Sequence, residues 1–108
     1  MGFLDTKHAL RFSAEKLAKT NLFETAQMFC DVYGLEPGQS QKAHAHPGAT
    51  KFYFVLEGRG VFQSGEQRRE LGPGELAWSA PGEEHGVENH SKERLVLLVA
   101  MAPNPNLR

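Results

Sequence analysis

The sequence has little cysteine and almost no net charge. Its 108 residues contain one cysteine, Cys30, which excludes an intrachain disulfide and favours a small buried apolar side chain. Twelve Lys and Arg nearly balance thirteen Asp and Glu, which gives a formal charge of -1. A protein with so little net charge has no large field to hold a polyanion. We therefore expect no nucleic acid partner.

Long apolar segments are also missing. The longest uncharged apolar run, residues 95–102, has eight residues, whereas a helix that crosses a bilayer needs roughly 20. The first ten residues lack the basic and apolar regions of a secretory signal. These features predict a cytoplasmic protein with no membrane partner. The chain also has no glycine-rich phosphate loop and no nucleophile and base pattern of covalent catalysis.

Glycine and proline, by contrast, recur at short intervals. The 11 Gly and 6 Pro separate short runs rich in β-branched and aromatic residues, which is typical of an all-β sandwich or barrel. The expected strands are 25–35, 41–46, 51–56, 60–63, 67–71, 75–79, 85–89 and 95–101.

We expect residues 1–108 to form a single domain. Its expected parts are an N-terminal arm with a short helix (1–24), a β-barrel (25–102) and a loose tail (103–108). The helical signal lies at 13–19, where Ser13 can cap the first turn. The tail is expected to be loose because its prolines have no amide hydrogen to donate to a strand.

Two of the expected strands are apolar on both faces. Residues 52–56 and 95–101 lack the polar alternation of a strand that has one face in water. A second copy of the same sheet would cover the outward side chains of Phe52, Phe54 and Leu56, which predicts a two-fold homodimer. The alternative is that residues 3–22 fold over this face within one chain.

Three of the five histidines have the spacing of metal ligands. His44 and His46 are two residues apart, so on a strand they share one face and their ring nitrogens can converge on one ion. His85 opens another expected strand directly after a Pro-Gly turn and can supply a third donor. Two histidines also occur on polar strand faces without a metal, so the pair alone leaves both interpretations open.

These residues resemble the two motifs of the cupins, small β-barrels of the jelly-roll type. The first motif, G-x5-H-x-H-x3,4-E-x6-G, has its counterpart at 38–58, with Lys51 in place of the Glu. The second, G-x5-P-x-G-x2-H-x3-N, has its counterpart at 74–89, with Ala80 in place of the Pro. The resemblance implies an all-β, single-domain cupin jelly-roll barrel.

The resemblance also implies that His44, His46 and His85 ligate a divalent transition metal, which could be Fe, Zn, Ni, Cu or Mn. Lys51 occupies the position of the usual fourth ligand, and a protonated lysine repels a cation and has no lone pair to donate. Either three histidines and water hold the metal, or no metal binds.

Lys51 itself has two interpretations. If its side chain faces the cavity, it makes an anion-attracting site, and Tyr53 shares that face as a second substrate-binding residue. If its amine reaches solvent at the barrel mouth instead, Lys51 contributes only to solubility.

Two functions follow from the pattern. One is a small cupin metalloprotein that acts on a small oxygenated or anionic molecule. The other is a metal-free cupin module that binds a small molecule with Lys51 as the anion anchor. Cupins include both enzymes and binding modules, so the fold leaves open whether this protein is an enzyme, and no catalytic residue is assigned.

Overall fold

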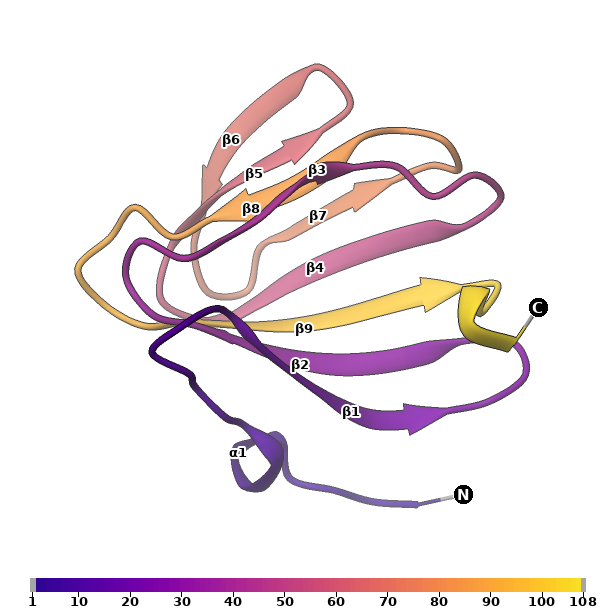
Figure 1. Ribbon diagram of the computed structural model, residues 1–108, viewed down its shortest axis with the longest axis horizontal. Coiled ribbons are helices and arrows are strands. Elements are labelled where there is room, and N and C mark those ends of the chain that lie inside the picture. The colour runs from indigo at the N-terminus through magenta and orange to yellow at the C-terminus, as the bar shows by residue number, and fades with distance from the viewer. Residues whose placement is uncertain (1, 108) are drawn as a thin grey trace.

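The computed structural model describes residues 2–107 and shows two antiparallel β-sheets that face each other (Figure 1). Its elements are α1 (Thr6–Ala9), β1 (Ala18–Glu24), β2 (Phe29–Leu35), β3 (Ser40–His44), β4 (Thr50–Glu57), β5 (Gly60–Ser64), β6 (Gln67–Leu71), β7 (Leu76–Ser79), β8 (His85–Glu88), β9 (Leu95–Ala102) and the 3-10 helix η1 (Pro105–Leu107). The all-β prediction is confirmed. No helix within residues 2–107 has the length and hydropathy needed to cross a membrane.

The sheets have non-sequential strand orders. The larger sheet has the order β1-β2-β9-β4-β7, and the smaller one has the order β3-β8-β5-β6. Every strand pair is antiparallel. Among the described residues no strand pairs with a strand of the other sheet, so the jelly roll is an open two-layer sandwich where a barrel was expected.

The core lies between the two sheets. On β4, buried and half-buried residues alternate, and Lys51, Tyr53 and Val55 are the buried, inward-facing set. The strand β9 is buried along most of its length: β2 and β4 flank its two edges, and Leu95, Leu97 and Val99 face the core. The largest apolar cluster contains Tyr33, Leu35, Tyr53, Val55, Phe62, Leu71, Val87, Leu95, Leu97 and Val99. Each fully buried Leu or Val stabilises the fold by roughly 1.5–3 kcal/mol.

The N-terminal arm differs from the prediction. The helix expected at 13–19 is absent, and a short helix lies instead at Thr6–Ala9, where the Asp5 carboxylate accepts a hydrogen bond from the amide of Lys7. Ser13 Oγ accepts from the amide of Glu15, but only in a bend. From Ala18 onward the chain pairs with β2. Pairing with a strand satisfies the backbone groups of this segment and overrides its weak helical preference.

The other end of the chain also differs from the prediction. Asn104 is 2% exposed, and its amide group donates to Glu24 Oε2 at 2.8 Å and to the carbonyl oxygen of Thr25 at 3.0 Å. The described part of the tail is therefore held against the end of β1. The strand expected from residue 25 begins at Phe29, because residues 25–28 form a turn closed by the Thr25 amide and the Met28 carbonyl.

The arm covers one end of the outer face of the larger sheet. A Cβ atom added to Gly34 would lie 2.9 Å from Cδ1 of Phe12, so the Phe12 ring packs directly on this glycine. The Arg94 guanidinium lies 4.2 Å from the centre of the same ring. At the other end of the face, Trp78 and Leu76 remain 60% and 46% exposed. The arm alone therefore covers only part of this apolar face.

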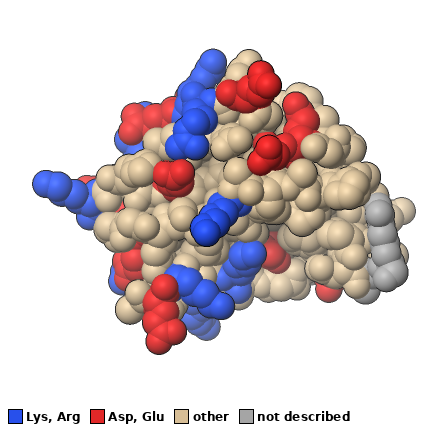
Figure 2. Space-filling model, turned by 45° about the horizontal axis from the view of Figure 1, so that its top comes forward, with Lys and Arg blue, Asp and Glu red and all other residues tan. Residues whose placement is uncertain are grey.

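Figure 2 shows basic and acidic side chains interspersed over part of the visible face. That distribution accords with the balanced composition of the chain.

Candidate metal centre

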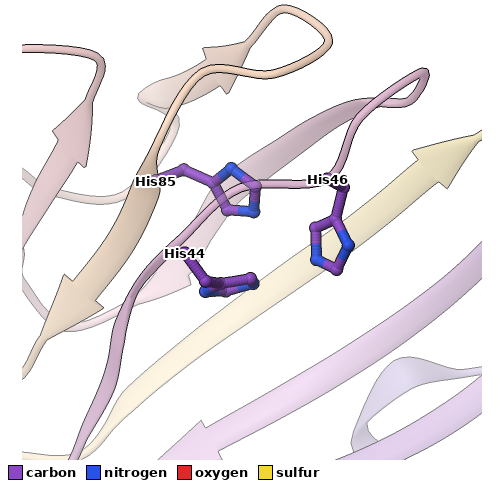
Figure 3. A group of neighbouring side chains, drawn as sticks. All are labelled: His44, His46 and His85. Atoms are coloured by element: carbon purple, nitrogen blue, oxygen red, sulfur yellow. The ribbon is translucent and has the colours of Figure 1, made fainter.

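Three histidine rings meet at one end of the sandwich (Figure 3). Their donor nitrogens all lie within 4.8 Å of one another. His44 ends β3 and pairs across the sheet with His85, the first residue of β8. His46 lies in the loop just beyond β3. Its carbonyl oxygen accepts a hydrogen bond from the amide of Gly82, in the turn that precedes His85. The structure thus brings together the three histidines singled out in the sequence.

Local hydrogen bonds orient two of these rings. His44 Nδ1 lies 2.7 Å from the carbonyl oxygen of Lys42. His85 Nδ1 lies 3.1 Å from the carbonyl oxygen of Glu83 and 3.0 Å from Ser79 Oγ. A carbonyl oxygen can only accept, so each Nδ1 carries the hydrogen and each Nε2 keeps a free lone pair.

The Nε2 atom of His85 is the unusual one. It is buried, and it has no hydrogen-bond partner among the described residues. A buried polar atom without a partner is costly unless a ligand satisfies it. Imidazole nitrogens with their second nitrogen held by a carbonyl are also the usual form of metal-bound histidine. The donor set therefore fits a divalent transition metal.

Burial keeps the three rings neutral at pH 7. It is the largest cause that lowers the pKa of each ring, and the nearby ammonium of Lys51 lowers them further. For His85 the pKa falls to about 4. Neutral imidazoles have the lone pairs that a metal requires.

The Lys51 side chain faces the interior and not the barrel mouth, which were the two positions that the sequence left open. It is 3% exposed and points to the same side as Tyr53, whose ring centre lies 5.0 Å from the amine. Its Nζ donates to Oε1 of Gln41 at 3.2 Å. Burial is the main cause that lowers the pKa of this amine from 10.5 to about 7, and the charge of Lys19 adds to it.

Gln41 is a site residue that no signal in the sequence singled out. Its Oε1 accepts hydrogen bonds from both Lys51 and the Tyr53 hydroxyl, and its Nε2 donates to the Tyr33 hydroxyl at 3.4 Å. Gln41 and His44 are three residues apart, so a regular strand would place them on opposite faces. An irregularity in the pairing of β3 with β8 between these two residues lets both face the interior.

A cavity of about 590 Å³ opens beside the histidines. Its wall includes Lys19, Asp31, Gln41, His44, His46 and Lys51. His85 is 3% exposed and lies outside this wall, deeper in the sandwich than the other two rings. The volume accommodates a small molecule next to the histidine group.

Comparison with known proteins identifies the family. Residues 31–101 match the family profile of the cupin domain. The chain belongs to the cupin family. The resemblance of its two motifs is thereby confirmed, with Lys51 and Ala80 as its departures from the family pattern.

This cupin is similar to several known proteins. It is 30% identical over 88 residues to an oxalate-binding protein of Thermotoga maritima, a match that covers 82% of this chain and 72% of the relative. A crystal structure of a Thermus thermophilus protein is 43% identical, has a TM-score of 0.94 and covers 97% of this chain and 100% of that one. A Klebsiella pneumoniae protein with a double-stranded β-helix domain is 24% identical, with a TM-score of 0.87 and coverage of 94% and 89%, which supports the fold alone.

Proposed function

We propose that this cupin holds a divalent transition metal on His44, His46 and His85 and binds a small oxygenated or anionic molecule beside it. The observation that carries the proposal is the buried Nε2 of His85, which has no partner among the described residues. It belongs to one of three rings that each offer a donor nitrogen within 4.8 Å of the others. Imidazole suits Fe, Zn, Ni and Cu, whereas Mn prefers oxygen ligands. When bound, such an ion supplies Lewis acidity or a redox centre.

Lys51 and Tyr53 are the residues that we propose for ligand binding. Lys51 lines the cavity, whereas Tyr53 is buried outside the cavity wall and its hydroxyl donates to Gln41. An ammonium group has three hydrogens, and Gln41 accepts only one of them. Lys51 is part of the cavity wall, so its remaining hydrogens can bind a carboxylate in the cavity. The oxalate-binding relative supports a small carboxylate as the ligand.

Elemental analysis of protein purified without an affinity tag tests the metal site. We expect about one transition-metal ion per chain, lost in both His44→Ala and His85→Ala. His90→Ala is the matched control, because His90 is exposed and lies outside the histidine group. A wild-type protein without metal, even after incubation with each of the five ions, would overturn the proposed metal site.

The second candidate function is a metal-free binding module with Lys51 as the anion anchor. The observation in its favour is the lysine itself, since its positive charge, which helps to lower the pKa of His85, also disfavours a cation there. Calorimetric titration with oxalate, before and after treatment with a chelator, distinguishes the two functions. Unchanged affinity after metal removal favours the module.

The homodimer is a further part of the proposal. Phe52 pairs with Trp78 and Phe54 pairs with Leu76 across β4 and β7, so these side chains form one apolar patch on the outer sheet face. We propose that a second copy covers it. Light scattering coupled to size exclusion should give the mass of a dimer for the wild type and of a monomer for Trp78→Ser. A monomeric wild type would contradict this assembly. Single-domain organisation, cytoplasmic location and the lack of a nucleic acid partner stay predictions.

A further inference from the structure

Asp31 lies in the wall of the same cavity, and the proposed function gives it no task. It is half-buried on β2 and faces inward, opposite Val99 of the neighbouring β9. One carboxylate oxygen accepts a hydrogen bond from Asn21 Nδ2 at 2.9 Å. Among residues 2–107 no other side chain donates to it. The second carboxylate oxygen is therefore available to a ligand.

Two ammonium groups share the cavity with this carboxylate. The amines of Lys19 and Lys51 lie 5.5 and 5.8 Å from the centre of the Tyr33 ring. Neither lysine forms an ion pair with Asp31 in the described part of the chain, although their charges act on its pKa. Unpaired charges in a partly buried cavity carry a desolvation cost that a ligand of matching chemistry can offset.

The burial of these groups decides which of the three charges interacts most strongly with a ligand. Lys19 is exposed, so water and salt screen its attraction for an anion. Lys51 is buried and Asp31 is half-buried, so their effects on a ligand are screened less. Lys51 therefore attracts the anionic group of a ligand, and Asp31 attracts a group of the ligand that can donate a hydrogen bond.

We infer that Asp31 determines specificity, by selecting a carboxylate ligand that carries a hydroxyl or ammonium group over a dicarboxylate of the same length. This inference rests on the proposed function, since it requires a carboxylate at Lys51. A hydroxyl or ammonium group donates a hydrogen bond to the Asp31 carboxylate. The second carboxylate of a diacid has no hydrogen to donate at pH 7, and it would place two negative charges together.

Calorimetric titration with matched pairs of acids tests the inference. Each dicarboxylate is paired with the hydroxy acid of equal chain length: oxalate with glycolate, malonate with 3-hydroxypropionate, and succinate with 4-hydroxybutyrate. We expect at least one pair to show binding of the hydroxy acid that is tighter by about tenfold or more. Comparison of β-alanine with 3-hydroxypropionate then shows whether an ammonium or a hydroxyl group is the preferred donor.

Asp31→Asn keeps the shape of the side chain and removes its charge. The amide can donate as well as accept, so the preference for the hydroxy acid should fall to near equality. Glu66→Gln is the matched control, because it removes the same charge from an exposed turn and should leave the preference unchanged.

The possible failures are distinguishable. Equal or tighter binding of the dicarboxylate in all three pairs of the wild type overturns the inference and leaves the carboxylate-binding function intact. A preference that survives in Asp31→Asn also overturns it, because another group must then select the ligand. If no acid of any pair binds to the wild type, the proposed binding function fails, and the inference fails with it.

Discussion

Lys51 should lower the stability of the protein at neutral pH. Its pKa falls from 10.5 to about 7 in the folded protein, and each pKa unit corresponds to about 1.4 kcal/mol. The charged amine in the fold therefore costs up to about 5 kcal/mol. Because the folded pKa is the lower one, the cost is full below about pH 7 and disappears as pH rises toward the unfolded value near 10.5.

Lys51→Met removes this charge and leaves an unbranched apolar side chain that is one heavy atom shorter. The variant loses the hydrogen bond to Gln41, which contributes about 1 kcal/mol, but Gln41 keeps its bond from the Tyr53 hydroxyl. We therefore expect the variant to be more stable than the wild type by about 3 kcal/mol near pH 6.5. This advantage should shrink by up to about 1.4 kcal/mol per pH unit between about pH 7.5 and pH 9.5.

Urea denaturation of chelator-treated protein at several pH values measures the effect. Tyr33, Tyr53 and Cys30 titrate in both proteins, so the difference between the two free energies of unfolding isolates Lys51 to a first approximation. Lys92→Met is the matched control, since Lys92 is exposed and should show no pH-dependent difference. A stability difference between Lys51→Met and wild type that stays constant from about pH 7.5 to about pH 9.5 would refute the reasoning.

Three further predictions concern the metal site and the arm. Lys51→Glu should tighten divalent-metal binding by about tenfold or more in calorimetry, because a carboxylate replaces a repelling charge beside the histidines. Ser79→Ala should weaken metal binding by about tenfold, as measured by competition with a chromophoric chelator, because Ser79 Oγ contacts Nδ1 of the His85 ring. Gly34→Ala should lower the free energy of unfolding by about 1–3 kcal/mol in urea denaturation, since the added methyl group overlaps the carbonyl oxygen of Arg11 and the Phe12 ring.

Each of these predictions has an outcome that contradicts it. An unchanged metal dissociation constant in Lys51→Glu would mean that side chain 51 does not reach the ion. Unchanged metal affinity in Ser79→Ala would leave the orientation of His85 to the Glu83 carbonyl alone. If Gly34→Ala is as stable as the wild type, the arm does not pack on β2 as the structure shows.

Local sequence signals predicted the all-β class, most of the strands and the histidine group. The Gly and Pro positions end the strands because turns require their particular backbone angles, as at Gly38 and Gly74, where φ is 87° and 85°. The spacing of His44 and His46, the position of His85 after a turn and the resemblance to the cupin motifs together indicated the three histidines. The turn and spacing signals depend only on neighbours in the chain, so the sequence by itself determined them, whereas the pairing of β3 with β8 brings His85 beside His44.

The arm and the tail needed the tertiary structure. Nothing within residues 18–24 shows that β2 is available as a pairing partner, and this pairing turns the expected arm into β1. Likewise, Asn104 is held by Glu24 and Thr25, which lie 80 and 79 residues earlier in the chain. Interactions between residues so distant in sequence leave no periodic pattern to detect.

In the cavity wall, too, the sequence determined some features and the tertiary structure decided others. The sequence determined that Lys51 replaces the usual carboxylate ligand, but the packing of the two sheets decided that its amine lies inside, against Tyr33 and Tyr53. An irregularity in β3 turned Gln41 inward, and the pairing of β2 with β9 placed Asp31 in the same cavity. Which polar side chains meet in a cavity depends on strand order and register, which are set by contacts between distant segments.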